Sequence, residues 1–174
     1  GVLDEAAWQQ ADRIDGLTTT VPKEGGRPSS HTTVRVLANS KYLVFGIRCE
    51  DPDPSKIVSY AVGRDASLFS EDHVKIILGT FLDGRTGYVF AVNPNGARYD
   101  AVVARRGESE DPDWDGIWEA KTQITVYGWQ VEVAFPLTTF SFDPEASQWG
   151  LNVSRRLKRL DQSGIWSSPR TSIR

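Results

Sequence analysis

Short runs that alternate between apolar and polar positions recur along this chain. Residues 32–37 and 42–49 are rich in β-branched and aromatic side chains, and the polar residues 38–41 separate them. Such a pair predicts a β-hairpin. A second hairpin is predicted for residues 86–92 and 97–103, because the Asn95 and Gly96 pair between them favours a tight turn.

Four further strands are predicted at residues 73–78, 118–124, 129–135 and 149–155. Alternation places their apolar side chains on one face, and that face should be the core. The predicted core residues are Val74, Ile76, Leu78, Tyr88, Phe90, Val92, Trp129, Val131, Val133 and Phe135. Eight short strands with helical turns only near residues 3–11 and 136–140 predict an all-β fold, an antiparallel β-sandwich of the immunoglobulin-like or jelly-roll type.

Composition narrows the class of protein. The 174 residues suffice for one domain, and the absence of Met and of a signal peptide leads us to expect that residues 1–174 are a single domain excised from a larger protein. The 20 basic and 23 acidic residues give a net charge of -3, which argues against nucleic-acid binding. No apolar run approaches the roughly 18 residues of a transmembrane helix.

The sequence carries no recognisable catalytic motif, neither a nucleophile elbow nor a phosphate-binding or dinucleotide-binding glycine loop. Cys49 ends an apolar strand and is expected to be buried and inert. His73 begins a strand and is expected at a surface or an edge. We therefore expect a domain that is not an enzyme, although the parent polypeptide could carry catalysis elsewhere.

The acidic segment at residues 111–116 is the most specific local pattern. Asp111, Asp113 and Asp115 alternate and are followed by Gly116, as in the first half of a calcium-binding loop. Thr122 stands where that pattern expects a bidentate Glu, so the second half is missing. A structural calcium ion bound by the three aspartates and a solvated acidic loop are both open interpretations.

Two of the six tryptophans lie outside any periodic run. Trp114 is flanked by acids, and Trp166 lies near the C-terminus, whereas Trp118, Trp129 and Trp149 begin strands and Trp8 should anchor the N-terminal segment. Exposed aromatic rings suit the apolar face of a sugar, with nearby polar groups on its hydroxyls. The candidate ligand-binding residues are Trp114, Trp166, Arg98, Asp100, Asp113 and Asp115. Packing of both loop tryptophans on the core is the alternative.

Five segments in order resemble one known family. Residues 3–8 (LDEAAW) are similar to its L-D-E-x-x-W opening, and residues 42–51 resemble its Y-L-Y strand ending in Asp. Residues 72–78 (DHVKIIL), 128–136 (GWQVEVAFP) and 149–155 (WGLNVSR) resemble its D-x-V-x-x-x-L, G-W-x-x-E-x-x-x-P and W-G-x-N-x-x-R strands. The family is the carbohydrate-binding module family 9-like domains, within the wider DOMON-like group.

Residues 81–88, 92–96 and 114–119 resemble a branch in which the module precedes a β-barrel region similar to outer-membrane proteins. The resemblance implies a β-sandwich that binds an oligo- or polysaccharide without catalysis, in a bacterial periplasmic, outer-membrane-associated or secreted location. It also implies two clamping tryptophans and structural calcium. Lys75 and Gly79 replace two acids of the family's D-x-V-E-x-x-x-D strand. Haem is not expected, because the chain has no Met ligand.

The main alternative is a structural or interaction domain that docks on a neighbouring β-barrel or another partner through its aromatic residues. An open groove beside exposed aromatic rings would favour sugar binding, whereas a flat apolar patch would favour docking.

Overall fold

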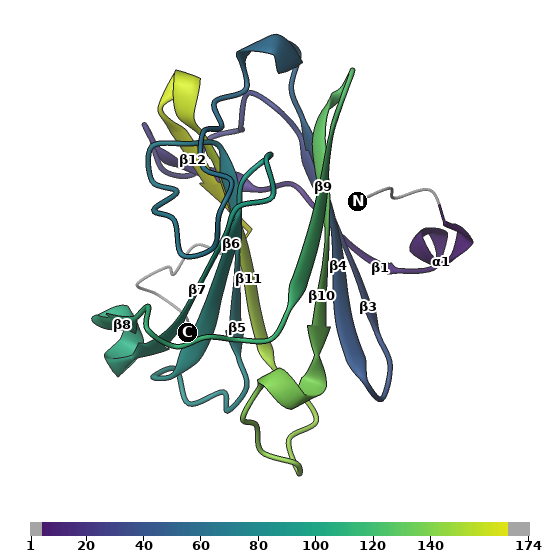
Figure 1. Cartoon of the computed structure of the whole chain (residues 1–174), viewed down its shortest axis with the longest axis vertical. Coiled ribbons are helices and arrows are strands. Elements are labelled where there is room, and N and C mark those ends of the chain that lie inside the picture. Colours follow the sequence, from purple (N-terminus) through teal and green to yellow (C-terminus); the bar gives the residue numbers. More distant parts are fainter. Residues whose placement is uncertain (1–4, 167–174) are drawn as a thin grey trace.

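Two antiparallel β-sheets pack face to face in the computed structural model, which describes residues 5–166 (Figure 1). One sheet has five strands in the order β1-β3-β4-β10-β9, and the other has seven in the order β2-β12-β11-β5-β6-β7-β8. The all-β sandwich predicted from the alternation is therefore confirmed.

The five-stranded sheet consists of β1 (Asp12–Asp15), β3 (Thr32–Ala38), β4 (Tyr42–Glu50), β9 (Glu119–Thr125) and β10 (Gly128–Pro136). The seven-stranded sheet consists of β2 (Thr18–Val21), β5 (His73–Gly79), β6 (Gly87–Val92), β7 (Arg98–Ala104), β8 (Ser109–Asp111), β11 (Gly150–Leu157) and β12 (Gln162–Ile165). The helical segments are α1 (Ala6–Gln9), η1 (Pro54–Lys56), η2 (Arg105–Gly107), η3 (Leu137–Thr139) and η4 (Lys158–Leu160). None of the helices in residues 5–166 is long and apolar enough to cross a membrane.

All eight predicted strands are present, and both predicted hairpins form, as the pairs β3–β4 and β6–β7. The predicted helical turns correspond to α1 and η3, although Leu3 and Asp4 of the first lie outside the described residues. The strands β1, β2, β8 and β12 were not predicted. Each has three or four residues, too few for a recognisable alternation.

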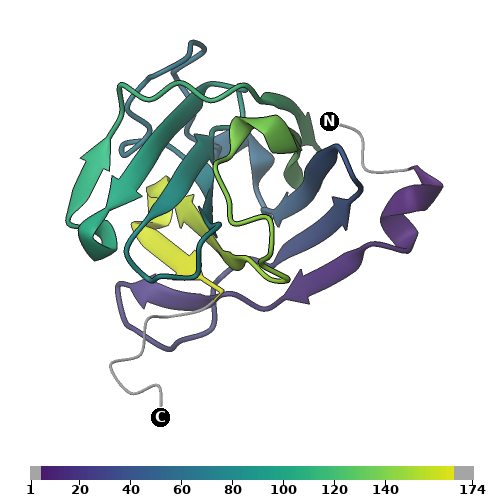
Figure 2. The same cartoon turned by 90° about the horizontal axis from the view of Figure 1, so that it is seen from below.

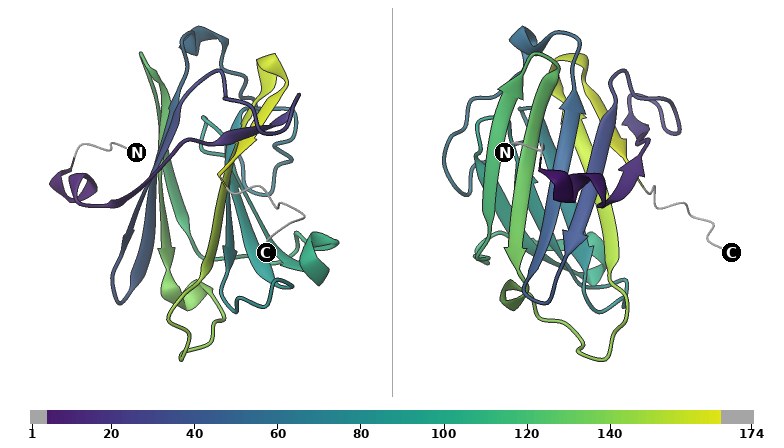
Figure 3. Two further views of the ribbon diagram at one scale, coloured as in Figure 1. Left: turned by 180° about the vertical axis from the view of Figure 1, so that it is seen from behind. Right: turned by 90° about the vertical axis from the view of Figure 1, so that its right-hand side faces the viewer.

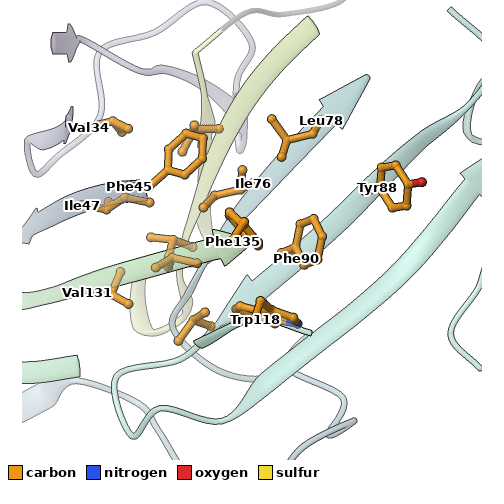
Figure 4. Close-up of a cluster of buried hydrophobic side chains, with 14 of the residues drawn as sticks. Val34, Phe45, Ile47, Ile76, Leu78, Tyr88, Phe90, Trp118, Val131 and Phe135 are labelled. Atoms are coloured by element: carbon orange, nitrogen blue, oxygen red, sulfur yellow. The ribbon is translucent and has the colours of Figure 1, made fainter. Parts of the chain in front are cut away.

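Aromatic rings from both sheets meet in the core (Figure 4). Phe90 on β6 and Phe135 on β10 have ring centroids 4.4 Å apart, and Trp118 contacts both rings. Every predicted core residue is buried, and Cys49 is also buried, as expected. Burial raises the pKa of the Cys49 thiol to about 11, so this thiol is protonated and unreactive at neutral pH.

The N-terminal segment joins the two sheets along one side of the sandwich (Figure 2). It contributes the edge strand β1 to the five-stranded sheet, paired with β3, and then the edge strand β2 to the seven-stranded sheet, paired with β12. Helix α1 lies outside the five-stranded sheet (Figure 3). Trp8 of this helix is buried, and the Arg35 guanidinium donates to its carbonyl oxygen at 2.6 Å, so Trp8 anchors the segment as expected.

Polar contacts also join the sheets at one end of the sandwich. Asp51 follows β4 and accepts two hydrogen bonds from the Arg159 guanidinium of η4, each at 2.6 Å. The side chain of Arg155, on β11, donates to the backbone carbonyls of His31 and Glu50 in the other sheet. Burial opposes ionisation of Asp51, but the guanidinium outweighs it and holds the pKa of this carboxyl below its ordinary value of 3.8.

This pKa predicts how the ion pair contributes to stability as the pH changes. A lowered folded-state pKa stabilises the fold above pH 3.8, and the contribution is lost as the pH falls through the folded-state value. Asp51→Asn should cost about 3 kcal/mol of unfolding free energy near neutral pH, because Arg159 loses its partner. Urea unfolding should show that this deficit shrinks towards about pH 2. Asp12→Asn, an exposed control, should cost little, and an unchanged Asp51→Asn deficit at low pH would contradict the assignment.

Candidate functional site

Trp114 packs against the core from the loop after β8. Its ring centroid lies 5.0 Å from that of Tyr88 and 6.0 Å from that of Phe90, both on β6. A Cβ atom on Gly116 would lie 2.7 Å from the Trp114 ring, so the glycine leaves room for the indole to fold inwards. The Trp114 indole therefore packs mainly against protein and offers little of its surface to a ligand.

Trp166 lies elsewhere and is 40% exposed. It follows β12, and its backbone N–H donates to the carbonyl of Val153 at 2.9 Å. Strand β12 lies three positions from β6 in the sheet order, so the two predicted clamp residues come from different parts of the sheet. The structure does not bring their indoles together.

Arg98 and Asp100 point between the sheets, because they alternate on β7 with the outward-facing Tyr99. The Arg98 guanidinium lies over the Trp118 ring, 5.4 Å from its centroid, and donates to the Trp118 carbonyl. Asp100 is fully buried and accepts from the Gly116 N–H at 2.6 Å and from Arg64 at 3.0 Å. Burial raises the pKa of Asp100 in spite of these donors. Both side chains are committed to internal contacts.

The predicted calcium ligands do not converge. Within residues 5–166, one group of three carboxylates has oxygen atoms that all lie within 4.8 Å of one another: Asp65, Asp100 and Asp115. Only Asp115 of this group belongs to the predicted calcium ligands. Arg64 contacts Asp100 at 3.0 Å and Asp115 at 3.2 Å through one nitrogen, and lies 3.7 Å from Asp65. A divalent cation bound by these carboxylates would therefore have to displace the Arg64 guanidinium.

The long connection between η1 and β5 runs outside the seven-stranded sheet (Figure 1). A groove lies between this connection and the outer face of the sheet. One part, of about 260 Å³, is lined by Asp65, Ser67, Leu68, Phe69, His73, Lys75, Ala91, Tyr99 and Pro112. An adjoining part, of about 320 Å³, shares Phe69, His73 and Lys75 and adds Ser154, Arg155, Arg156 and Ser163. We call the two parts together the β5 groove.

The connection is fixed at its two ends by buried polar groups. The Glu71 carboxylate accepts from the backbone N–H groups of Tyr60 and Ala61 at 2.7 and 3.0 Å, and from the Asn93 side chain at 2.8 Å. Between the two anchored ends of the connection, Leu68 packs on Ala91 of β6. Because both flanks are anchored, the intervening Phe69 is held outwards, with 75% of its surface exposed.

The groove combines aromatic, cationic and hydroxyl groups. The Lys75 ammonium lies 5.7 Å from the centroid of the Phe69 ring. Tyr99 forms part of the floor, and its hydroxyl donates to the Glu110 carboxylate; burial and this carboxylate raise the pKa of Tyr99. His73 is buried, contrary to the expectation of a surface position, and its Nδ1 lies 3.1 Å from the Glu71 carbonyl. Burial lowers the pKa of His73, which favours the neutral imidazole.

Two other depressions lie along the five-stranded sheet and share His31, Arg48 and Glu50. Their walls include several charged side chains, among them Arg48 and Glu50. Tyr127 lines one of them, and the Arg48 guanidinium lies 5.1 Å from the centroid of its exposed ring. The β5 groove differs from them in its floor, which contains the buried apolar side chains of Leu68 and Ala91.

The sequence gives a partial signal for this groove. Alternation with the core residues places Lys75 and Tyr99 on the outer face of their strands. Phe69 has no such signal, because it belongs to an irregular segment, and only the folded connection shows that its ring is exposed.

No protein-family model matches this sequence, and no curated protein matches it. Solved structures share its architecture. A family 9 carbohydrate-binding module from Caldicellulosiruptor kristjanssonii aligns at a TM-score of 0.67 both in complex with cellotriose and in complex with glucose. Each alignment has 12% identity and covers 96% of this chain, with 78% and 80% of the respective module chains.

This chain has the fold of a family 9 carbohydrate-binding module. A protein from Bacteroides uniformis to which carbohydrate binding is ascribed aligns at a TM-score of 0.72 and 12% identity, over 95% of this chain and 81% of that one. The resemblance seen in the sequence is thus confirmed for the family 9 module fold.

The role of Arg64 in this module-like fold predicts a large effect on stability. Arg64→Gln should cost about 3 kcal/mol of unfolding free energy, because it leaves the buried Asp100 carboxylate without its counter-charge. Adding Asp100→Asn should recover part of this loss, since the uncompensated charge is then removed. Denaturant unfolding measures both variants. Arg13→Gln, which breaks an exposed ion pair with Asp15, serves as the control and should cost less than about 1 kcal/mol.

The same cluster predicts the response to metal removal. Because the Arg64 guanidinium already contacts Asp100 and Asp115, treatment with a chelator should leave the melting temperature unchanged. Differential scanning calorimetry with EDTA and with added calcium checks this. A fall in melting temperature that calcium reverses would instead support the calcium loop predicted at Asp111, Asp113 and Asp115.

Proposed function

We propose that this chain is a non-catalytic carbohydrate-binding domain and that the β5 groove holds the sugar. The observation that carries the proposal is the exposed Phe69 ring, held by an anchored connection beside a groove with an apolar floor. The fold supports it, because solved structures of the same fold include modules in complex with glucose and cellotriose.

The chemistry of the groove suits a pyranose ring. The C–H face of the sugar stacks on an exposed aromatic ring such as Phe69, and the hydroxyls of Ser67 and Ser154 and the Lys75 ammonium are available to the sugar hydroxyls. A single shallow platform gives modest affinity, with Kd on the order of 10 μM to 1 mM.

The lining of the groove also supports binding without catalysis. Hydrolysis of a glycosidic bond by the usual mechanism uses two carboxyl groups on either side of that bond. Among residues 5–166, the lining of the β5 groove includes one carboxylate, Asp65, and Arg64 lies 3.7 Å from it. Two further parts of the proposal rest on the resemblance alone: a periplasmic, outer-membrane-associated or secreted bacterial location, and a β-barrel region following this domain in the parent chain.

One feature favours the docking alternative. At the turn between β9 and β10, Val126 is 82% exposed and Tyr127 is 63% exposed. These side chains lie beside the five-stranded sheet, away from the β5 groove. A partner bound there would leave the groove open, so the two functions can be separated by variants.

Calorimetric titration tests sugar binding with glucose, cellobiose, cellotriose and a panel of other soluble oligosaccharides. Phe69→Ala should weaken binding about tenfold or more, because a few aromatic anchors dominate such sites. The fold should be unchanged, since Phe69 is exposed. Phe81→Ala, also an exposed phenylalanine, is the matched control and should bind normally.

Trp166→Ala and Trp114→Ala extend the titration to the predicted tryptophan clamp. Loss of binding in Trp166→Ala with normal binding in Phe69→Ala would move the site to the C-terminal segment. Flat titrations across the whole panel would contradict sugar binding and favour docking through Val126 and Tyr127.

A further inference from the structure

Lys75 stands at the centre of the β5 groove and lines both of its parts. It lies on β5, where its neighbours across the sheet are Ala91 on β6 and Ser154 on β11. Both neighbours are short, so the long Lys75 side chain rises from the floor with open space on either side. Its ammonium reaches the Phe69 ring, 5.7 Å from the centroid.

No carboxylate in residues 5–166 forms an ion pair with Lys75. The nearby acids are engaged elsewhere: Asp65 lies 3.7 Å from Arg64, and Glu71 is bound by backbone N–H groups. The other two cations of the groove lining have partners: Arg156 pairs with Asp161, and the Arg155 guanidinium donates to the carbonyls of His31 and Glu50. The centre of the groove therefore carries a positive charge without a fixed partner.

The exposed Phe69 ring and the unpaired Lys75 ammonium lie next to each other in the groove. The ring favours an apolar face of the ligand, and the ammonium favours a negatively charged group. A neutral pyranose stacks on the ring and offers the ammonium only uncharged hydroxyls. A pyranose with a negatively charged group at C6 can stack on the aromatic ring and pair with the ammonium, and charge-assisted hydrogen bonds of this kind are stronger than neutral ones. We infer that the β5 groove selects anionic saccharides, with Lys75 as the residue that determines the selectivity. This inference rests on the proposed function.

The selectivity can be measured with sugars that differ only at C6: methyl β-D-glucopyranoside, its 6-carboxylate and its 6-sulfate, and the corresponding galactosides. Titration at low ionic strength should show that one or both anionic members bind about tenfold more tightly than their neutral counterpart. The preference should decline in about 0.5 M salt, where the Debye length is only a few ångströms. Comparison of the carboxylate with the sulfate identifies which anion the groove takes.

Variants assign the preference to Lys75. Lys75→Gln should bring the affinities for the neutral and the anionic sugars within about twofold of each other, whereas Lys75→Arg should retain the preference. Lys121→Gln is the matched control, because Lys121 is an exposed lysine on β9 of the other sheet. This control should keep the full preference.

The outcomes separate the inference from the proposed function. Equal affinity for neutral and anionic sugars, with Phe69→Ala defective for both, would overturn the inference and leave the sugar-binding groove in place. A preference that survives in Lys75→Gln would also overturn it. Failure of every sugar to bind would overturn the proposed function, and the inference would fall with it.

Discussion

The contact between Phe90 and Phe135 across the two sheets is the constraint on which the rest of the structure depends. Phe90 comes from β6 and Phe135 from β10, and these two rings together contact Tyr88, Trp114, Trp118, Phe140 and Phe45. Because strands alternate their side chains, committing one face of each sheet to this aromatic core turns the other face outwards. The outer faces are then available for loops and ligands.

The seven-stranded sheet uses its outer face to carry an irregular segment. Such a segment has backbone groups that no strand pairing satisfies, and here the buried Glu71 and Asn93 side chains supply the partners. The same hydrogen bonds keep the connection in one conformation over β5 and β6. Under the proposed function, a Phe69 held in place in this way lowers the entropy lost when a sugar binds.

The sequence predicted the interior of this fold far better than its site. In strands of six or more residues with one buried face, apolar and polar side chains alternate along the sequence. All of these strands were predicted. Short edge strands such as β8, at Ser109–Asp111, leave no such pattern. The sequence left Trp114 open between a ligand platform and packing on the core, because periodicity says nothing about a loop that folds back over Gly116. Asp100 looked available because its partner, Arg64, lies 36 residues away in the chain.

The N-terminal segment gives the sandwich a mechanical asymmetry. Residues 12–21 supply the edge strands β1 and β2, whereas the groove lies on β5, β6, β7 and β11. When a force acts on the N-terminal side, the hydrogen bonds of β1 with β3 and of β2 with β12 bear it first. These two edge strands can then separate one hydrogen bond at a time. The strands beneath the groove stay paired while this happens. Under the proposed function, a domain tethered on that side would lose the pairing of β1 and β2 first, while the strands that carry the proposed sugar groove stay paired.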